Sequence, residues 1–378
     1  MKTEWVHKKL GDDDVAKIIM GQSPSSASYN DENIGLPFLQ GCADFGEVFP
    51  KTSVYCNEPL KVAPQNSILM SVRAPVGTIN KADQKYIIGR GLCSIVSLIN
   101  NDYLYYYLLQ NKNRLEQKAQ GSTFLAINSA EVNDFDVSYP ESLSTQRRIA
   151  AILTSADKVI AATQKTIAKY KQIKQGMMED LLKPKEGWKK VKLGECCESE
   201  LGKTLDEGRN TGLYRPYLCA LNVLWGKIDR STIKRMRIED SELERYLVKK
   251  GDLLVCEGGE IGRCAIWDYD DVIYYQNALH RVRFYDGYDA RFFMYLLCHY
   301  NDLKLIEQYG KGLTIKHLNQ TAFRNIPVCV PDLAAQRRIA AILSGIDAKI
   351  AAEEKVLEKY TLVKKGLMER LLEEDNDE

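Results

Sequence analysis

Few of the side chains that commonly do chemistry in proteins fall into a recognisable pattern in this sequence of 378 residues. Its ten cysteines form no Cys-x-x-Cys pair and its four histidines are too dispersed for a His-x₃-His pair, so no metal site is predicted. Gly202-Lys203-Thr204 resembles the end of a phosphate-binding loop, but Cys197 stands where that loop requires a glycine.

Other catalytic signatures are equally incomplete. The loop with which amino-methyltransferases hold their target base requires two adjacent prolines, and the sequence has no such pair. Pro331-Asp332 is not followed by the Glu-x-Lys of nucleases, and the sequence lacks the Gly-x-Ser-x-Gly motif of hydrolases. We therefore expect a protein that is not an enzyme.

The composition predicts a folded protein of two or three domains, since 45% of the residues are hydrophobic and 9% are aromatic. A net charge of +1 argues against a protein that binds nucleic acid with its whole surface, although it allows local basic patches. No apolar run reaches the length of a transmembrane helix or forms a signal segment. The cysteines are then expected to be reduced thiols in the cytoplasm.

An internal repeat organises the whole chain. The octapeptide at 146–153, Gln-Arg-Arg-Ile-Ala-Ala-Ile-Leu, returns letter for letter at 336–343. Around it, residues 146–182 and 336–372 are identical at 21 of 37 positions, whereas the rest of the two halves agrees faintly, mainly at apolar and glycine positions. Two near-identical segments predict contact with two copies of one partner, or with each other. Two divergent globular parts predict recognition of two different targets.

Both repeated segments carry mainly apolar residues at alternating spacings of four and three, beginning at Ile149 and Ile339. This heptad pattern predicts two long coiled-coil helices of about 55 Å each. Antiparallel pairing would place the globular parts at opposite ends, and because DNA advances about 34 Å per turn, it would separate two contact sites by more than one turn. The helices either only hold the globular parts together or also dock a partner, and docking is the favoured interpretation.

This organisation resembles that of the specificity subunits of type I restriction-modification systems. The resemblance covers residues 4–372 and rests on the duplicated helix start, on a Gly-x-Thr loop at Gly121 and Gly312, and on Pro140 and Pro331 before the helices. One departure is the opening loop. The first half reads Gly-Gln-Ser-Pro-Ser from residue 21, near the family's Gly-x-Thr-Pro-Ser, whereas the second half reads Gly-Lys-Thr-Leu from residue 202.

The resemblance implies a non-catalytic, sequence-specific subunit that recognises a bipartite site in double-stranded DNA. Its helices would bind two methyltransferase subunits, and the assembly would recruit restriction subunits with motor and nuclease activity. S-adenosylmethionine would be bound by the methyltransferase, so no cofactor is expected on this chain. The implied fold is α/β (α+β), with two target-recognition domains joined by two long antiparallel coiled-coil helices in a pseudo-twofold repeat.

The expected boundaries follow the repeat. The first target-recognition domain is predicted at 1–143, the first helix at 144–183, the second domain at 184–333, the second helix at 334–373 and an acidic tail at 374–378. Within the domains, strands are expected at 67–72, 93–99, 252–256 and 281–284, and helices at 103–115 and 289–308.

Loops between the strands are the expected DNA readers, because base edges and phosphates are contacted by polar side chains and closely approaching backbone. The candidates for DNA binding are Arg73, Arg90, Gly121, Ser122 and Thr123 in the first domain, and Arg263, His280, Lys311, Gly312, Thr314, Lys316 and His317 in the second. The candidates for partner binding are Arg147, Arg148, Lys169, Lys174, Arg337, Arg338, Lys359 and Lys364.

Structural interpretations compete at several positions. Asn128 and Asn319 precede short helices and are expected to be N-caps. The tyrosines of residues 103–107 are expected to pack within the domain rather than stack on bases, and His280 lies between apolar neighbours that favour burial. A stand-alone DNA-binding regulator, a coiled-coil adaptor and the specificity subunit of another restriction type remain open as functions.

Overall fold

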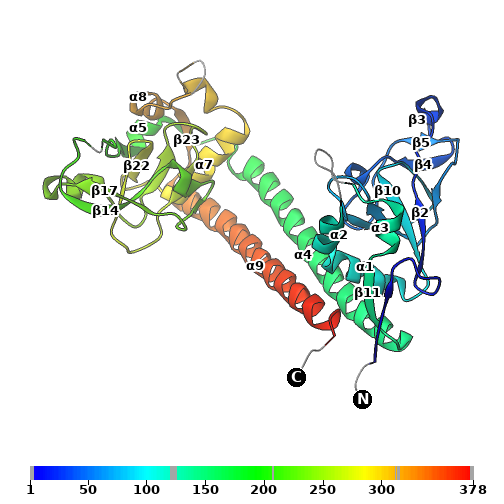
Figure 1. Cartoon of the computed structure of the whole chain (residues 1–378). Coiled ribbons are helices and arrows are strands. Elements are labelled where there is room, and N and C mark those ends of the chain that lie inside the picture. The colour runs from blue at the N-terminus through cyan, green and yellow to red at the C-terminus, as the bar shows by residue number, and fades with distance from the viewer. Residues whose placement is uncertain (1–3, 120–125, 207, 311, 313–315, 375–378) are drawn as a thin grey trace. The chain divides into compact units, whose positions relative to one another are not determined.

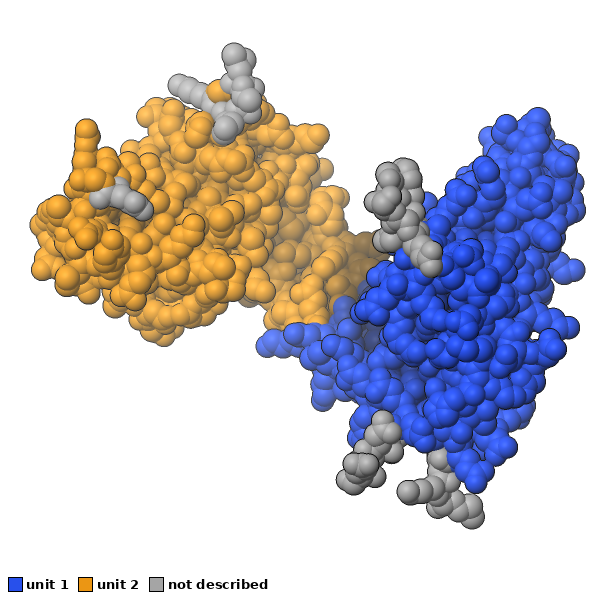
Figure 2. All heavy atoms as spheres, viewed as in Figure 1, with its two compact units in different colours: residues 1–164, 355–378 blue, residues 165–354 orange. Residues whose placement is uncertain are grey.

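The computed structural model describes residues 4–119, 126–206, 208–310, 312 and 316–374, which belong to two compact units (Figure 2). Unit 1 comprises residues 1–164 and 355–378, and unit 2 comprises residues 165–354. Each unit therefore holds one globular domain and one part of each of two long helices.

The globular domain of unit 1 contains a central antiparallel sheet of four strands, because its apolar runs alternate with turn-forming segments (Figure 1). The strand order is β2 (Ala16–Met20), β10 (Leu92–Ser97), β7 (Ile68–Ser71) and β8 (Ile79–Lys81). A second sheet has the order β3 (Tyr29–Asn30), β5 (Tyr55–Cys56), β4 (Leu36–Leu39), β9 (Tyr86–Ile88) and β6 (Val62–Ala63). The described α-helices of this domain are α1 (Asn101–Gln110), α2 (Lys112–Lys118) and α3 (Ser129–Asn133), and β1 (Trp5–Lys9) pairs with β11 (Asp136–Pro140).

The globular domain of unit 2 repeats this plan. Its central sheet has the order β13 (Cys197–Leu201), β22 (Leu279–Phe284), β19 (Leu253–Cys256) and β20 (Cys264–Ile266). Its second sheet has the order β17 (Lys234–Ile238), β14 (Leu213–Leu218), β21 (Ile273–Tyr275) and β18 (Leu247–Val248). Two strand pairs, β12 (Lys189–Lys192) with β23 (Pro327–Val330) and β15 (Val223–Leu224) with β16 (Lys227–Ile228), accompany α5 (Leu193–Cys196), α6 (Leu243–Tyr246), α7 (Ala290–Asp302) and α8 (Gln320–Arg324).

The two domains are copies of one topology. In each central sheet the longest strand, β10 or β22, lies between an N-terminal strand and a buried apolar strand. In each second sheet one parallel pair, β4 with β9 or β14 with β21, interrupts an otherwise antiparallel arrangement. The predicted mixed α and β class is therefore confirmed, and the faint sequence agreement between the halves reflects a shared framework.

Two helices of 39 residues, α4 (Leu143–Leu181) and α9 (Leu333–Leu371), confirm the long helices predicted from the heptads. In unit 1, Ile149 and Leu153 share a core with Met368 and Leu372, and in unit 2 the helix starts and ends share a core in the same manner. The early residues of one helix thus meet the late residues of the other, so the helix segments within each unit run antiparallel. None of the helices in the described ranges is long and apolar enough to cross a membrane.

Two shorter helices differ from the sequence expectation. The helix expected at 103–115 is divided into α1 and α2 at Asn111, whose backbone departs from helical geometry with a φ of −96° and a ψ of 18°, and whose amide and side chain both donate to the carbonyl of Tyr107. The helix expected at 289–308 ends at Asp302, because Lys304 adopts a left-handed backbone with a φ of 57°. The tyrosines of α1 are buried in the core, as expected.

Candidate nucleic-acid interface

At one end of the strands of each central sheet, the connecting loops are held together by backbone hydrogen bonds. In unit 1 the amide of Gly21 donates to Leu92 O at 2.9 Å, that of Val72 to Gly91 O at 2.9 Å, and that of Ile127 to Val72 O at 3.0 Å. These bonds join the loops that follow β2, precede β10, follow β7 and precede α3. We call this cluster of loops the loop end of the sheet.

The loop end of unit 2 has the same hydrogen bonds at equivalent positions. Gly202 N donates to Leu279 O at 3.2 Å, Glu257 N to Ala278 O at 2.9 Å, and Leu318 N to Glu257 O at 2.7 Å. The opening glycine is required in both halves, because a Cβ would lie 2.1 Å from Gly89 O at Gly21 and 2.4 Å from Tyr275 O at Gly202. The backbone is thus duplicated even where the opening loops differ in sequence.

The side chains of the unit 1 loop end present two exposed arginines. Arg90 lies in the loop before β10, where its amide donates to the Ser23 hydroxyl at 3.2 Å. Arg73 forms a backbone bridge with Ala126, which lies in the loop before α3. Both arginines are exposed, which keeps their guanidinium groups available to bases or phosphates. Gly121, Ser122 and Thr123 lie outside the described residues.

The unit 2 loop end has a different set of polar groups on the same backbone. Gly258 takes the place of Arg73 and is bridged to His317, whose exposed ring lies 3.0 Å from the Glu257 carboxylate. Exposed Lys316 pairs with Glu307 at 2.9 Å, and this bond lowers the pKa of the Glu307 carboxyl. Gly312 has a φ of 121°, a backbone conformation that favours glycine. Lys311 and Thr314 lie outside the described residues.

Two predicted DNA readers of unit 2 serve the fold instead. His280 was wrongly included, because its ring is fully buried on β22, stacks on Phe323 at 5.2 Å and donates from Nε2 to Leu318 O at 2.6 Å. That burial lowers the pKa of His280. Arg263 donates from Nη2 to Ala220 O at 2.8 Å and pairs with Glu260, and only 19% of its side chain is exposed. Arg263 therefore stabilises the loop that contains Ala220 rather than presenting its charge to solvent.

The expected N-caps are confirmed. The side chain of Asn128 accepts from the amide of Glu131, whose carboxylate accepts from the amide of Asn128, so the two form a capping box. Asn319 accepts from the amide of Ala322 in the same way at 2.9 Å. Both asparagines are therefore used in ending the loop and starting the helix.

The basic residues proposed for partner docking divide into two groups. Six of them are exposed on the helices, namely Arg147, Arg148, Lys169, Arg337, Arg338 and Lys359. The other two, Lys174 and Lys364, contact the opposite helix, where they pair with Asp347 and Asp157 at 2.6 Å each. The assignment of these two lysines to an external partner is corrected, because their charges are already used within each unit.

Each of these ion pairs belongs to a duplicated three-residue contact. In unit 1, the Tyr106 hydroxyl donates to Asp157 at 2.7 Å, and Lys364 lies 5.5 Å from the centroid of the tyrosine ring. In unit 2, Tyr295 donates to Asp347 at 2.7 Å, and Lys174 lies 5.4 Å from that ring. Burial, followed by the nearby carboxylate, raises the pKa of both tyrosines. We call these contacts the Tyr-Asp-Lys clusters; each joins a globular domain to both helices.

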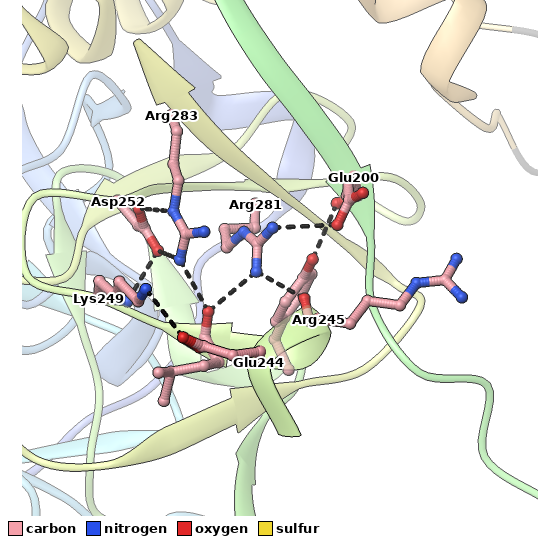
Figure 3. Close-up of polar contacts among 9 residues, drawn as sticks. Glu200, Glu244, Arg245, Lys249, Asp252, Arg281 and Arg283 are labelled. Atoms are coloured by element: carbon pink, nitrogen blue, oxygen red, sulfur yellow. Dashed lines mark hydrogen bonds and ion pairs between the residues drawn. The ribbon is translucent and has the colours of Figure 1, made fainter. Parts of the chain in front are cut away.

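A network around buried Arg281 and half-buried Arg283 joins the two sheets of unit 2 (Figure 3). Arg281, with 4% of its side chain exposed, pairs with Glu200 at 3.0 Å and donates to the carbonyls of Arg245 and Leu247. Arg283 pairs with Asp252 at 2.8 Å and also donates to Leu247 O. These bonds fix the turn between α6 and β18 against the central sheet.

The sequence reasoning overlooked a basic strand in unit 2. Strand β17 presents Lys234, Arg235 and Arg237 to solvent while Met236 and Ile238 are buried. The signal was the alternation of basic and apolar letters from 235 to 238, which is the period of a strand with one face in water.

Comparison with known proteins places the chain in a family. The family model described as "Type I restriction modification DNA specificity domain" matches residues 2–172 and again residues 185–361. The chain belongs to this family. Its two matches correspond to the two halves of the internal repeat.

Two relatives agree with this assignment. A protein of Methanocaldococcus jannaschii named as a type I restriction enzyme MjaX specificity subunit is 41% identical over 182 residues, which cover 47% of this chain and 43% of that protein. The match thus spans less than half the length of that relative. The MjaVIII specificity subunit of the same organism is 25% identical over 300 residues, covering 73% of this chain and 70% of that protein.

The crystal structure of a type I restriction-modification S subunit from M. genitalium has a similar fold. It superposes with a TM-score of 0.67 at 17% identity and covers 98% of this chain and 96% of the other. At this level of identity the likeness shows the fold alone.

Proposed function

We propose that this chain is the specificity subunit of a type I restriction-modification enzyme, and that each unit reads one half of a bipartite DNA site with its loop end. The observation that supports this proposal is the pair of loop ends with one backbone framework and different side chains. Specificity comes from side chains that contact base edges, whereas a common backbone only positions them. A duplicated enzyme would be expected to keep equivalent catalytic side chains in both copies.

The duplicated helices support docking of two identical partners. Arg147 and Arg148 on α4 match Arg337 and Arg338 on α9, and all four are exposed. We infer that these exposed faces bind two methyltransferase subunits, and that restriction subunits join the same assembly. The methyltransferase would bind S-adenosylmethionine, this chain would contribute recognition without catalysis, and the assembly would act on DNA in the cytoplasm.

The test is co-purification with a co-expressed type I adenine methyltransferase of the same organism, followed by sequencing of methylated DNA from cells with and without the chain. We expect a stable complex and a gapped two-part motif whose methylation disappears when the chain is absent. Absence of a complex together with unchanged methylation would contradict the proposal and favour a stand-alone regulator or an adaptor.

The helices are proposed to set the gap between the half-sites. Seven added residues keep the heptad register and lengthen a helix by about 10 Å, which corresponds to about three base pairs. Insertion of one heptad after Gln164 and one after Glu354 should therefore lengthen the gap of the methylated motif while leaving both half-sites unchanged. The gap is read directly from methylome sequencing, and an unchanged gap in a folded variant would remove the spacer role.

A further inference from the structure

The second sheet of unit 2 has a basic and aromatic face. Strand β17 is the edge of this sheet and pairs with β14, so that Tyr214 faces Arg237 and Pro216 faces Arg235 across the strands. Residues opposite each other in a sheet lie on the same face. The two arginines and Tyr214 are exposed, and 57% of Tyr214 is open to solvent.

Among the described residues, the cations of this face have no acidic partner, unlike other basic residues of unit 2. Lys250 pairs with Asp270 and Arg291 pairs with Asp268, at 3.0 and 2.6 Å. Within the described part of the chain, no carboxylate pairs with Arg235 or Arg237; Arg235 donates instead to the carbonyl of Tyr214. Their positive charge is therefore left uncompensated by described neighbours.

The stacking of Arg237 orients its donors. Its guanidinium lies 5.1 Å from the centroid of the Tyr214 ring. A guanidinium held against a ring keeps its in-plane N–H groups free for a second ligand, and its planar fork matches the oxygens of a phosphate. The aromatic ring thus holds a phosphate donor in place.

The matching sheet of unit 1 differs at these positions. Pro37 of β4 corresponds to Pro216 of β14, because each immediately precedes the parallel pairing with β9 or β21. Opposite Pro37 stands Tyr55, where Arg235 stands opposite Pro216. The basic face belongs to unit 2 alone at this position, although the sheets share their topology.

We propose that the face formed by Tyr214, Arg235 and Arg237 binds phosphates of double-stranded DNA, and that it gives unit 2 a backbone contact that unit 1 does not make through the corresponding sheet. This inference rests on the proposed function, because it takes DNA as the ligand of the chain. Phosphate contacts fix the position and orientation of a protein on a duplex without reading its sequence. The face therefore contributes affinity and register, while the loop end of unit 2 supplies specificity.

Protection of a sheet edge is the competing explanation of charge on β17, since edge strands often carry lysine or arginine to prevent pairing with other chains. That explanation requires no aromatic ring beneath the guanidinium and no exposed tyrosine beside it. It also predicts that removal of the charges leads to self-association rather than to weaker DNA binding.

The test measures DNA affinity against salt concentration for the full chain in complex with its methyltransferase, using the duplex that carries the methylated motif and a second duplex of arbitrary sequence. Removal of one phosphate-binding cation lowers the slope of log K against log salt by about 0.9. When the salt concentration is raised from about 50 to 200 mM, the affinity for either duplex should therefore fall about 10-fold less in R235A/R237A than in the wild type. Its methylated motif should stay the same.

Two further variants serve as controls. K250A/R291A removes the same charge from paired residues of unit 2 and should keep the wild-type slope. R235K/R237K keeps the charge and should also keep most of the slope, which shows that the effect of alanine is electrostatic. Equal slopes for R235A/R237A and K250A/R291A would overturn the proposal, and so would self-association with unchanged binding.

The arbitrary duplex separates this inference from the proposed function. A chain that directs no methylation motif, yet binds this duplex with a slope that falls in R235A/R237A, would contradict the proposed function and support the phosphate contact. A wild-type chain that binds neither duplex would overturn the inference. Unchanged DNA binding with weaker capture of the methyltransferase would assign the face to a protein partner and would also overturn it.

Discussion

Some parts of unit 1 and unit 2 are nearly identical, whereas other parts share only their backbone. The Tyr-Asp-Lys clusters agree within 0.1 Å in the distances between their polar atoms and between lysine and ring. The loop ends keep their backbone hydrogen bonds but exchange Arg73 for Gly258 and Arg90 for Asn277. The contacts between domain and helices must therefore keep the same geometry in both units. The side chains of the loop ends can differ, because each unit needs only its own set.

The cores of the two central sheets also differ, and this difference carries the largest expected effect on stability. Arg281 of β22 pairs with Glu200 in unit 2, whereas the equivalent Ser94 of β10 donates to Ser67 at 2.8 Å in unit 1. Arg281→Ala leaves the Glu200 carboxylate and the Arg245 carbonyl without their donor, while Leu247 O keeps only Arg283, and this should cost about 3 kcal/mol of the free energy of unfolding of unit 2. Ser94→Ala should cost about 1 kcal/mol in unit 1.

Hydrogen exchange resolved by peptide measures these two effects within the full chain. We expect Arg281→Ala to increase exchange in unit 2 only, and Ser94→Ala to produce a smaller increase in unit 1 only. Equal increases in both variants would show that the buried charge network contributes no more than a pair of neutral hydroxyl groups.

The loop ends should control separate halves of the DNA motif. Arg73→Ala with Arg90→Ala should weaken recognition of one half-site by about 1–3 kcal/mol for each base that the arginines bind, without change in thermal stability, because both side chains are exposed. Lys316→Ala with His317→Ala should act on the other half-site. Methylome sequencing reads both effects, and relaxation of the same half-site by both double variants would contradict the division of recognition between the units.

Substitution in the Gly-x-Thr segments extends this comparison. Thr123→Ala in unit 1 and Thr314→Ala in unit 2 should weaken DNA binding and leave the melting temperature unchanged. A parallel decrease of binding and of stability would assign these threonines to the structure of the domain rather than to the DNA.

Acid should destabilise unit 2 more than unit 1. Burial lowers the pKa of His280, whereas the equivalent Cys93 of unit 1 is a thiol whose burial raises its pKa to about 12. A buried neutral histidine binds fewer protons folded than unfolded, so stability is complete above about pH 6.5 and falls as the pH drops below the unfolded pKa. The expected slope is at most about 1.4 kcal/mol per pH unit for this residue.

Thermal unfolding of wild type and His280→Cys at pH 7.5 and 5.5 measures this effect. The variant loses packing at both pH values but should show a smaller difference between them, with His299 supplying a remaining slope because burial also lowers its pKa. An unchanged pH dependence would exclude His280 as the acid-sensitive group.

The smallest expected effect tests the likeness of the Tyr-Asp-Lys clusters. Double-mutant cycles with Asp157→Asn and Lys364→Met in unit 1, and with Asp347→Asn and Lys174→Met in unit 2, should each give a coupling of about 1 kcal/mol or less, because these pairs are partly exposed. The two couplings, measured by chemical unfolding, should be equal. A clear difference would mean that the same geometry gives different coupling energies in the two units.

Much of the fold followed from local patterns. The heptads from Ile149 and Ile339 predicted the two long helices, and Asn128 with Glu131 predicted a capping box, because both depend on spacing within one helix. Helix ends were predicted less well, since Asn111 and Lys304 stop helices through side-chain bonding and backbone conformation that apolar periodicity does not reveal.

The candidate site was predicted in part. Arg73 and Arg90 are exposed at a loop end, whereas His280 and Arg263 are used inside unit 2. The type of a polar residue does not show whether its side chain points toward solvent or toward the core. Lys174 and Lys364 illustrate the same limit on the helices, because the partner of each lies on a segment about 170 or more residues away in sequence, close only after the helices pair.

The sequence by itself determined the repeat, the two long helices and the division into near-identical helical and divergent globular parts. These features depend on residue identity and on periodicity along the chain, and both can be read from the sequence without knowledge of the tertiary structure. The tertiary structure decided which charges remain available. It buried Arg281 against Glu200 and left Arg235 and Arg237 without an acidic partner among the described residues. That choice depends on which strands pair and which faces meet, because desolvation and ion pairing act between residues brought together only by folding.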